Sequence, residues 1–443
     1  MTTAFEDNAA LERSTVQRIT SRLIPFLAVL FVVNFLDRTN VGFAALRMRA
    51  DVGISPSIYG LGAGIFFIGY CLCELPSNLA LYRFGARRWL ARILISWGIV
   101  ATLMACLQNA WQFIGLRVLL GVAEAGFYPG VIYFLSLWFP ARHRARVTAL
   151  FYLAVPIAQA IGAPLSTWLI DAGDSAGFTG WRLMFLLEGL PAIVLGVICF
   201  YWLTDSPATA KWLSDGQREW LIKELENEES LKPQDPQVSY WRQITRTMGS
   251  KYTLALGLIY FGITSGSNAM NFFLPSVIQG FKTTSGVRVD LLTTGLLTAI
   301  PYAVASVAMV LWSRHSDQTQ ERRFHVGVAA IVAAVAIGLA FALNRPIAIL
   351  LGFTVMAAGV YSAINVFWSV PARIFSGVGA AAAIGMINSI GNLSGFSGAY
   401  LIGFIFERTN SFAPAFLTIS GFVCLAGVGF IALLGQRSAK KFA

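Results

Sequence analysis

Twelve long apolar runs constrain the fold of this 443-residue chain more than any other feature of its sequence. They cover residues 23–46, 57–82, 89–107, 111–139, 147–171, 182–203, 252–280, 291–312, 325–343, 346–372, 378–406 and 412–435. A helix of about 20 apolar residues crosses the hydrocarbon core of a bilayer, and it satisfies its own backbone there. Only 12% of the residues are charged, whereas soluble proteins carry about 25%. The sequence therefore predicts an all-α membrane protein with twelve transmembrane helices.

The longest polar segment divides these runs into six and six. We predict an N-terminal six-helix bundle over 1–203, a cytoplasmic linker over 204–251 and a C-terminal six-helix bundle over 252–443. Within the linker, Ser214 and Gln217 match a capping box, in which each side chain bonds a free backbone N–H group of the other residue. This pattern predicts an amphipathic surface helix over 214–229.

The formal charge of +11 reflects membrane topology rather than a nucleic-acid partner. Most Lys and Arg residues fall at the two termini and in every second loop, the pattern of segments that stay in the cytoplasm. We therefore expect both termini to be cytoplasmic and no nucleic acid to bind. The five cysteines lie in apolar runs and are interpreted as small buried hydrophobes rather than disulfides or metal ligands.

Two adjacent charges, Asp37 and Arg38, interrupt the first apolar run. A charge at that depth costs at least about 2.5–3.5 kcal/mol, so these side chains should face a protein interior or a water-filled cavity. In the fourth run, Arg117 and Glu124 are seven residues apart and share a helix face. The fork of a guanidinium matches the two oxygens of a carboxylate, so we predict that Arg117, with Arg38, binds an organic anion. The alternative is that these charges only pair with each other.

Asp37 and Glu124 are the predicted proton-binding residues. Burial favours the neutral carboxyl and a nearby arginine favours the charged one, so such a group can change state during a transport cycle. Glu74, one turn from Tyr70, is a third acid in an apolar run, whereas Glu188 is expected to be interfacial or structural because it lies near the end of one.

The remaining predicted substrate-binding residues are neutral. They are Tyr70, Gln159, Asn365, Asn388 and Asn392. Hydrogen bonding between helices is the alternative explanation for such polar groups in a membrane protein. The chain has no phosphate-binding loop of the Gly-x-x-x-x-Gly-Lys-Ser/Thr type, so ATP is not expected as the energy source. We expect no metal, no cofactor and no enzymatic activity.

The two halves share a loop pattern, since 77–90 and 312–325 both place a polar turn ahead of paired arginines. Together with the twelve runs, this repeat resembles the major facilitator superfamily, whose signature loop controls gating. The residues that fit the loop are Arg83, Gly85 and Arg87 in the first copy and Asp317 and Arg322 in the second. The first copy departs from the pattern, because Tyr82 stands where the family has an Asp.

Four segments narrow the resemblance to the anion:cation symporter branch of that superfamily. They are 35–44, 115–130, 181–192 and 202–213. The resemblance implies a protein of the bacterial inner membrane that takes up a small organic anion with protons. It also assigns proton coupling to Asp37 and Glu124, and anion binding to Arg117 and Arg38.

We therefore expect proton-driven symport of a carboxylate such as tartrate, phthalate or hydroxyphenylacetate, by a monomer in the lipid bilayer. A sugar-acid symporter and a proton-coupled drug antiporter are the alternatives, although an arginine in the cavity favours anions over lipophilic cations. A membrane sensor or an intramembrane enzyme would need a signalling domain or a catalytic cluster, and neither is evident in the sequence.

Overall fold

The computed structural model describes residues 2–144, 147, 153–230, 245–281, 289–375 and 377–441, and this part of the chain is almost entirely helical. The helices and the two short 3-10 turns are α1 (Thr2–Val52), α2 (Pro56–Phe84), α3 (Ala86–Leu103), η1 (Met104–Cys106), α4 (Ala110–Glu124), α5 (Phe127–Trp138), α7 (Ala154–Ser175), α8 (Gly180–Trp202), η2 (Pro207–Thr209), α9 (Asp215–Ser230), α11 (Lys251–Gln279), α12 (Leu291–Thr319), α13 (Arg323–Leu343), α14 (Pro346–Phe367), α15 (Ser369–Ile374), α16 (Gly377–Thr409) and α17 (Ala413–Lys441). The all-α prediction is confirmed.

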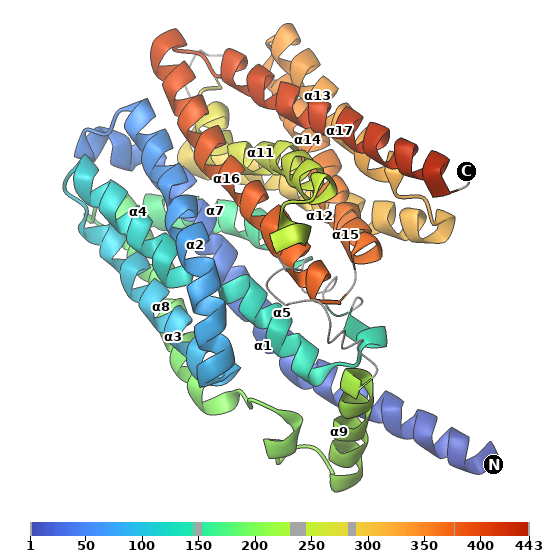
Figure 1. Ribbon diagram of the computed structural model, residues 1–443. Coiled ribbons are helices and arrows are strands. Elements are labelled where there is room, and N and C mark those ends of the chain that lie inside the picture. The colour runs from blue at the N-terminus through green and yellow to red at the C-terminus, as the bar shows by residue number, and fades with distance from the viewer. Residues whose placement is uncertain are drawn as a thin grey trace.

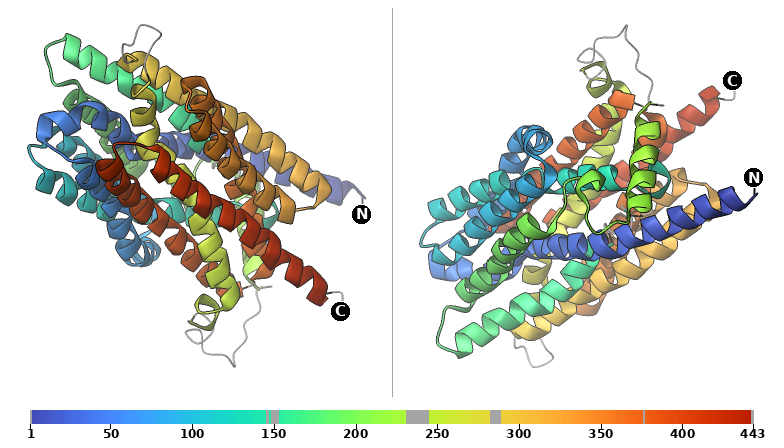
Figure 2. Two further views of the ribbon diagram at one scale, coloured as in Figure 1. Left: turned by 90° about the horizontal axis from the view of Figure 1, so that it is seen from above. Right: turned by 90° about the horizontal axis from the view of Figure 1, so that it is seen from below.

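The helices form two groups that follow the order of the chain (Figure 1). In the first group α3 packs on α8 and α2 on α4, and in the second α13 packs on α14 and α17. Contacts between the groups run mainly through three helix pairs, which are α2 with α16, α7 with α12 and α1 with α11. Both ends of the chain lie at the same end of the helix array (Figure 2). A central site therefore has to be built at these three pairs.

Ten helical stretches in the described residues are long and apolar enough to cross a membrane. The two predicted spans outside this set correspond to α7 and α11, helices of 22 and 29 residues. Both lie at the interface between the groups, and both carry polar side chains such as Gln159 and Asn268. These polar side chains lower the mean hydropathy of the two helices, which therefore fall outside the set of ten.

The fourth predicted span is not one continuous helix. The chain breaks between α4 and α5 at Gly126, whose φ of +86° favours glycine. A side chain at this position would also collide with Ser77 on α2. The break places Glu124 at the last position of α4, inside the protein rather than in a regular helix turn facing lipid.

The linker helix α9 is attached to the first group of helices. Ser214 and Gln217 make both hydrogen bonds of the predicted capping box, each at 3.3 Å. Farther along α9, Glu224 and Glu228 form ion pairs with Arg142 at 3.0 Å and Arg144 at 2.9 Å. These contacts fix the linker helix beside the segment that follows α5.

The packing of α4 on α2 depends on a close backbone approach at Gly121. A Cβ atom at this position would clash with the carbonyl oxygen of Phe66 on α2. Gly115, on the same helix, has no neighbour within 4 Å of a built Cβ atom. The two glycines therefore lie in the same helix but differ in how closely other residues pack against them.

We expect Gly121→Ala to lower the apparent melting temperature of the detergent-solubilised protein, because overpacking costs about 1–3 kcal/mol. Gly115→Ala is the matched control. It should leave the melting temperature unchanged or raise it, since alanine stabilises a helix by about 0.5–1 kcal/mol relative to glycine. Equal melting temperatures for the two variants would contradict the close approach of α2 and α4.

Candidate functional site

A cavity of about 110 Å³ lies between the two groups of helices, at the contacts of α1, α2 and α11 with their partners. Its polar lining residues include Asn34, Arg38, Tyr70, Tyr260, Asn268, Asn271, Tyr361, Asn388 and Asn392. Arg38 is the charged residue among the described lining residues. Ligand pockets are commonly about 300–1,000 Å³, so this cavity is contracted and suits a small anion.

The Arg38 guanidinium is held at the cavity by an ion pair with Glu124. Its Nε donates a hydrogen bond to Glu124 Oε1 at 2.5 Å, and its Nη2 contacts the same oxygen. The rings of Phe35, Phe66 and Tyr70 surround the guanidinium, with centroids 5.1–5.5 Å from Cζ. Among the described residues, the second carboxylate oxygen of Glu124 has no hydrogen-bond partner. Of this pair, the Arg38 cation lines the cavity, and the Glu124 carboxylate is buried behind it.

Asp37 points away from this cavity, as expected from the 100° step between successive helical residues. Its carboxyl accepts hydrogen bonds from Trp97 Nε1 at 2.5 Å and Asn40 Nδ2 at 3.3 Å, and the residue is 2% exposed. Within the part of the chain that the structure describes, Asp37 forms no ion pair. Its role in proton binding stays a prediction.

Arg117 does not line this cavity in the structure. Its Nε donates to the carbonyl oxygen of Gly62 at 3.2 Å and its Nη2 to that of Ala63 at 2.8 Å. The residue is 1% exposed, and among the described residues it has no ion pair with Glu124. The close approach of α2 and α4 brings these carbonyl groups within reach. In this conformation Arg117 joins two helices, and substrate binding by it stays a prediction.

Three of the five neutral residues predicted to bind substrate line the cavity, namely Tyr70, Asn388 and Asn392. Gln159 does not line the cavity, but its Oε1 accepts a hydrogen bond at 2.7 Å from Tyr361, which does. Asn365 is turned away, since its Nδ2 donates to Ser313 Oγ on α12 at 2.8 Å. For Asn365, hydrogen bonding between helices is the explanation that the geometry favours.

Sequence reasoning missed Asn34, Tyr260 and Thr264, which also line the cavity. Asn34 lies four residues before Arg38 and so shares its helix face, a signal that could have identified it. Tyr260 and Thr264 continue one face of α11 toward Asn268 and Asn271. The four-residue spacing of Tyr260, Thr264 and Asn268 on the first span after the linker is a signal that could have identified them.

Two further acids take positions that the sequence did not specify. Asn388 Nδ2 donates to Glu74 Oε1 at 3.1 Å, which links α16 to α2 across the two groups. Of the two alternatives expected for Glu188, interfacial or structural, the geometry favours the second, because the residue is 4% exposed and accepts a hydrogen bond from Ser166 Oγ at 2.7 Å. It lies more than two turns inside α8.

The predicted gating loops form ion pairs in both halves. The carboxylate that the first loop lacks at Tyr82 comes from Asp205, after α8, which accepts a hydrogen bond from the Arg87 backbone N–H at 2.8 Å and pairs with its Nε at 3.4 Å. Gly85 makes the turn with a φ of +87°. Arg83 instead lies over the Phe84 ring, at 5.7 Å.

In the second loop, Arg322 pairs with Asp317 and donates to Ser316 Oγ at 2.5 Å. Each half therefore keeps an arginine–carboxylate pair, although the first half draws its carboxylate from a different segment. The gating role of these residues stays a prediction.

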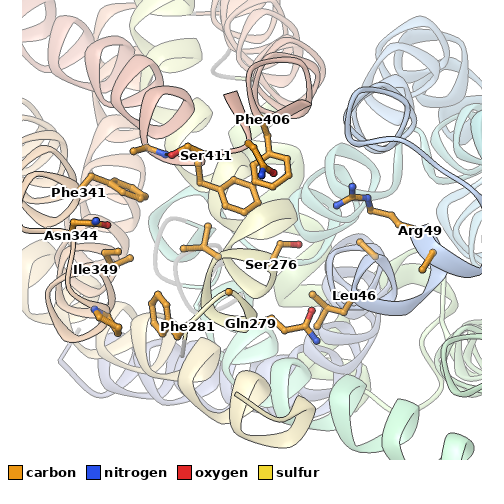
Figure 3. A pocket seen from close by; sticks show the side chains of 18 of the residues that line it. Leu46, Arg49, Ser276, Gln279, Phe281, Phe341, Asn344, Ile349, Phe406 and Ser411 are labelled. Carbon is orange, nitrogen blue, oxygen red and sulfur yellow. The ribbon is translucent and has the colours of Figure 1, made fainter. Parts of the chain in front are cut away.

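A larger cavity of about 770 Å³ lies away from these residues, near the ends of α1, α11 and α16 (Figure 3). Arg49 is its charged residue among the described lining residues, and phenylalanines and amides form much of the rest. None of the predicted proton-binding or substrate-binding residues lines it. The smaller central cavity is therefore the candidate site. In the described residues no group of three or more His, Cys, Asp or Glu side chains is arranged to hold a metal ion.

Comparison with known proteins identifies the family. The model of the Major Facilitator Superfamily matches residues 27–399. A proposed tartrate transporter of Agrobacterium vitis is 43% identical over 98% of this chain and 97% of its own length. A quinolone resistance transporter of Acinetobacter baumannii is 39% identical over 92% of each chain.

The solved structure of a D-xylose-proton symporter has the same fold. Its TM-score is 0.71, at 17% identity, over 94% of this chain and 97% of that one. The fold, the family model and the relatives agree with the resemblance seen in the sequence. The chain therefore belongs to the Major Facilitator Superfamily, and it is a multi-pass membrane protein that works as a secondary transporter and not as an enzyme.

Proposed function

We propose that this transporter takes up a small organic carboxylate, such as tartrate, together with protons across the bacterial inner membrane. The observation that carries the proposal is that Arg38, which lines the central cavity, is paired with the buried carboxylate of Glu124. A substrate carboxylate and Glu124 are alternative partners for one guanidinium. The tartrate transporter of A. vitis, similar to this chain along almost its full length, supports the substrate class.

The geometry suggests how protons and substrate are coupled. When Glu124 binds a proton it loses its charge, and its hold on Arg38 weakens. The guanidinium then turns to the carboxylate of the substrate, while amides of the second half, such as Asn388 and Asn392, donate to its other oxygens. When Glu124 releases the proton, its carboxylate pairs with Arg38 again and displaces the substrate anion. The proton gradient thus supplies the energy, and no cofactor is needed.

The two groups of helices rock about this site to expose it to each side in turn. We propose that the protein works as a monomer, with both chain ends in the cytoplasm. The two ends lie at the same end of the helix array (Figure 2), and the basic loops support the cytoplasmic side. Positive charge is then concentrated where the membrane potential favours it.

Proton-coupled drug export is the second candidate, favoured by the 39% identity to a quinolone resistance transporter. It predicts that expression raises drug tolerance without uptake of organic acids. Expression in a strain that lacks its own tartrate uptake, followed by assays of labelled tartrate and of quinolone tolerance, separates the two candidates.

We expect Asp37→Asn and Glu124→Gln each to abolish accumulation of tartrate driven by a proton gradient, because neither amide can bind and release a proton. Counterflow of labelled against unlabelled tartrate should persist, since it needs no net proton movement. Glu219→Gln, an exposed change on α9, is the control. Normal accumulation by both variants would show that the assignment of proton binding is wrong.

Arg38→Lys and Arg117→Lys should have different effects. A hydrogen bond to a charged group contributes about 1.5–3 kcal/mol, so loss of the guanidinium at Arg38 should raise the KM for tartrate by about ten-fold or more. Arg117→Lys should mainly lower the melting temperature, because it removes bonds that join α2 and α4. If Arg117→Lys raises the KM and Arg38→Lys does not, the two arginines have been assigned the wrong way round.

A further inference from the structure

A second buried carboxyl, Glu188, lies beside Asp37 and has no part in the coupling described above. It comes from α8, whereas Asp37 comes from α1, and these two helices pack against each other. The two side chains are close enough for their negative charges to repel each other. Glu188 is 4% exposed and Asp37 is 2% exposed, so protein encloses both carboxyl groups in this conformation.

One amide lies beside both acids. Asn40 Nδ2 donates a hydrogen bond to Asp37 Oδ1 at 3.3 Å, and the same side chain also lies close to the Glu188 carboxyl. Asn40 lies one turn after Asp37 on α1 and is itself buried. The amide can therefore stabilise a negative charge on either carboxyl, but it provides no positive charge of its own.

The other hydrogen-bond donors to this pair are neutral as well. Trp97 Nε1 on α3 donates to Asp37 Oδ2, and Ser166 Oγ on α7 donates to Glu188 Oε1. The second oxygen, Glu188 Oε2, is buried and has no hydrogen-bond partner among the residues that the structure describes.

Glu124 on α4 is another acid whose charge acts on Asp37, and it is already paired with Arg38 on α1. In the described residues neither Asp37 nor Glu188 has a cation as a partner. Two buried carboxylates cannot both stay ionised side by side without such a partner, because burial and mutual repulsion both oppose the second charge.

We propose that Asp37 and Glu188 form one proton-binding unit, with Asn40 beside both, in which at most one of the two carboxyls is ionised. Glu188 is then a proton-binding residue of the transporter and not a structural one. The unit exchanges its proton with water when the conformation opens it, and no proton has to pass through Asn40. Ionisation of one member makes ionisation of the other harder, so the two titrate as a pair.

This proposal rests on the proposed function only for the link to transport, so its first test needs no substrate. Infrared spectra of the purified full chain in lipid, recorded through a pH titration, report protonated carboxyl groups by their C=O stretching band. We expect Glu188→Gln to remove part of this band, and Glu219→Gln, the exposed control on α9, to leave it unchanged. An identical band in wild type and Glu188→Gln would overturn the proposal.

Coupling between the two acids has its own readout. In Asp37→Asn, the midpoint at which Glu188 loses its proton should move to lower pH by about one unit or more, because the neighbouring negative charge is gone. Ser166→Ala keeps both carboxyls and should shift the midpoint without removing the band. It serves as the second variant if Glu188→Gln does not fold. An unchanged midpoint in Asp37→Asn would show that the two acids are independent.

A transport assay completes the test. Proteoliposomes with a pH-sensitive dye inside are given labelled tartrate outside, so that tartrate uptake and proton entry are both measured. Coupling between two sites commonly changes a binding affinity by about 5–150-fold. We expect tartrate uptake by Glu188→Gln to lose a proton dependence of that size, while counterflow continues. If wild type moves tartrate without protons, the proposed function fails and the infrared result still stands. If wild type is coupled and Glu188→Gln is equally coupled with an unchanged band, the inference alone fails.

Discussion

The pairing of Arg38 with Glu124 is the interaction on which the central site depends. Each charge alone would cost at least about 2.5–3.5 kcal/mol at membrane depth, so each requires the other or a substitute. The chain meets this requirement by ending α4 at Glu124, with a left-handed glycine two residues later, so that the carboxylate reaches α1. Because the partner of Arg38 is an acid that can be neutralised, the cavity can alternate between a paired arginine and one available to an anion.

The two halves divide the work of the site unequally. The first half supplies the charged residues, and the second half supplies amides and hydroxyls such as those of Asn268, Tyr361 and Asn392. The proposed proton-binding groups are therefore packed within one set of helices, where the proposed rocking would leave their mutual distances unchanged. The second half can move over the substrate and make or break neutral hydrogen bonds, which cost less to rearrange than buried ion pairs.

The sequence could predict the fold because lipid allows few solutions, and apolar runs of sufficient length have to become helices. It could also predict which residue types form the site, since a charge inside an apolar run is costly and usually has a function or a partner. What it could not predict was the partner of each charge. Arg117 and Glu124 share a helix face by spacing, yet the close contact of α2 with α4 gives Arg117 two carbonyl groups, and Arg38 takes the acid. Glu188 appeared peripheral by its position along the run, although its depth depends on where α8 begins.

Helix α2 connects this chemistry to the movement of the two halves. Toward one end, the backbone N–H of Ser57 donates to Glu407 on α16 at 2.7 Å, and 17 residues later Glu74 accepts from Asn388 on the same helix. These contacts lie about 25 Å apart along α2, at 1.5 Å per residue, so rocking that opens one side of the cavity can break one and keep the other. Arg117 binds α4 to α2. In the proposed mechanism, a change of charge at the end of α4 would therefore act on a helix that is bonded to α2, the helix that connects the two halves.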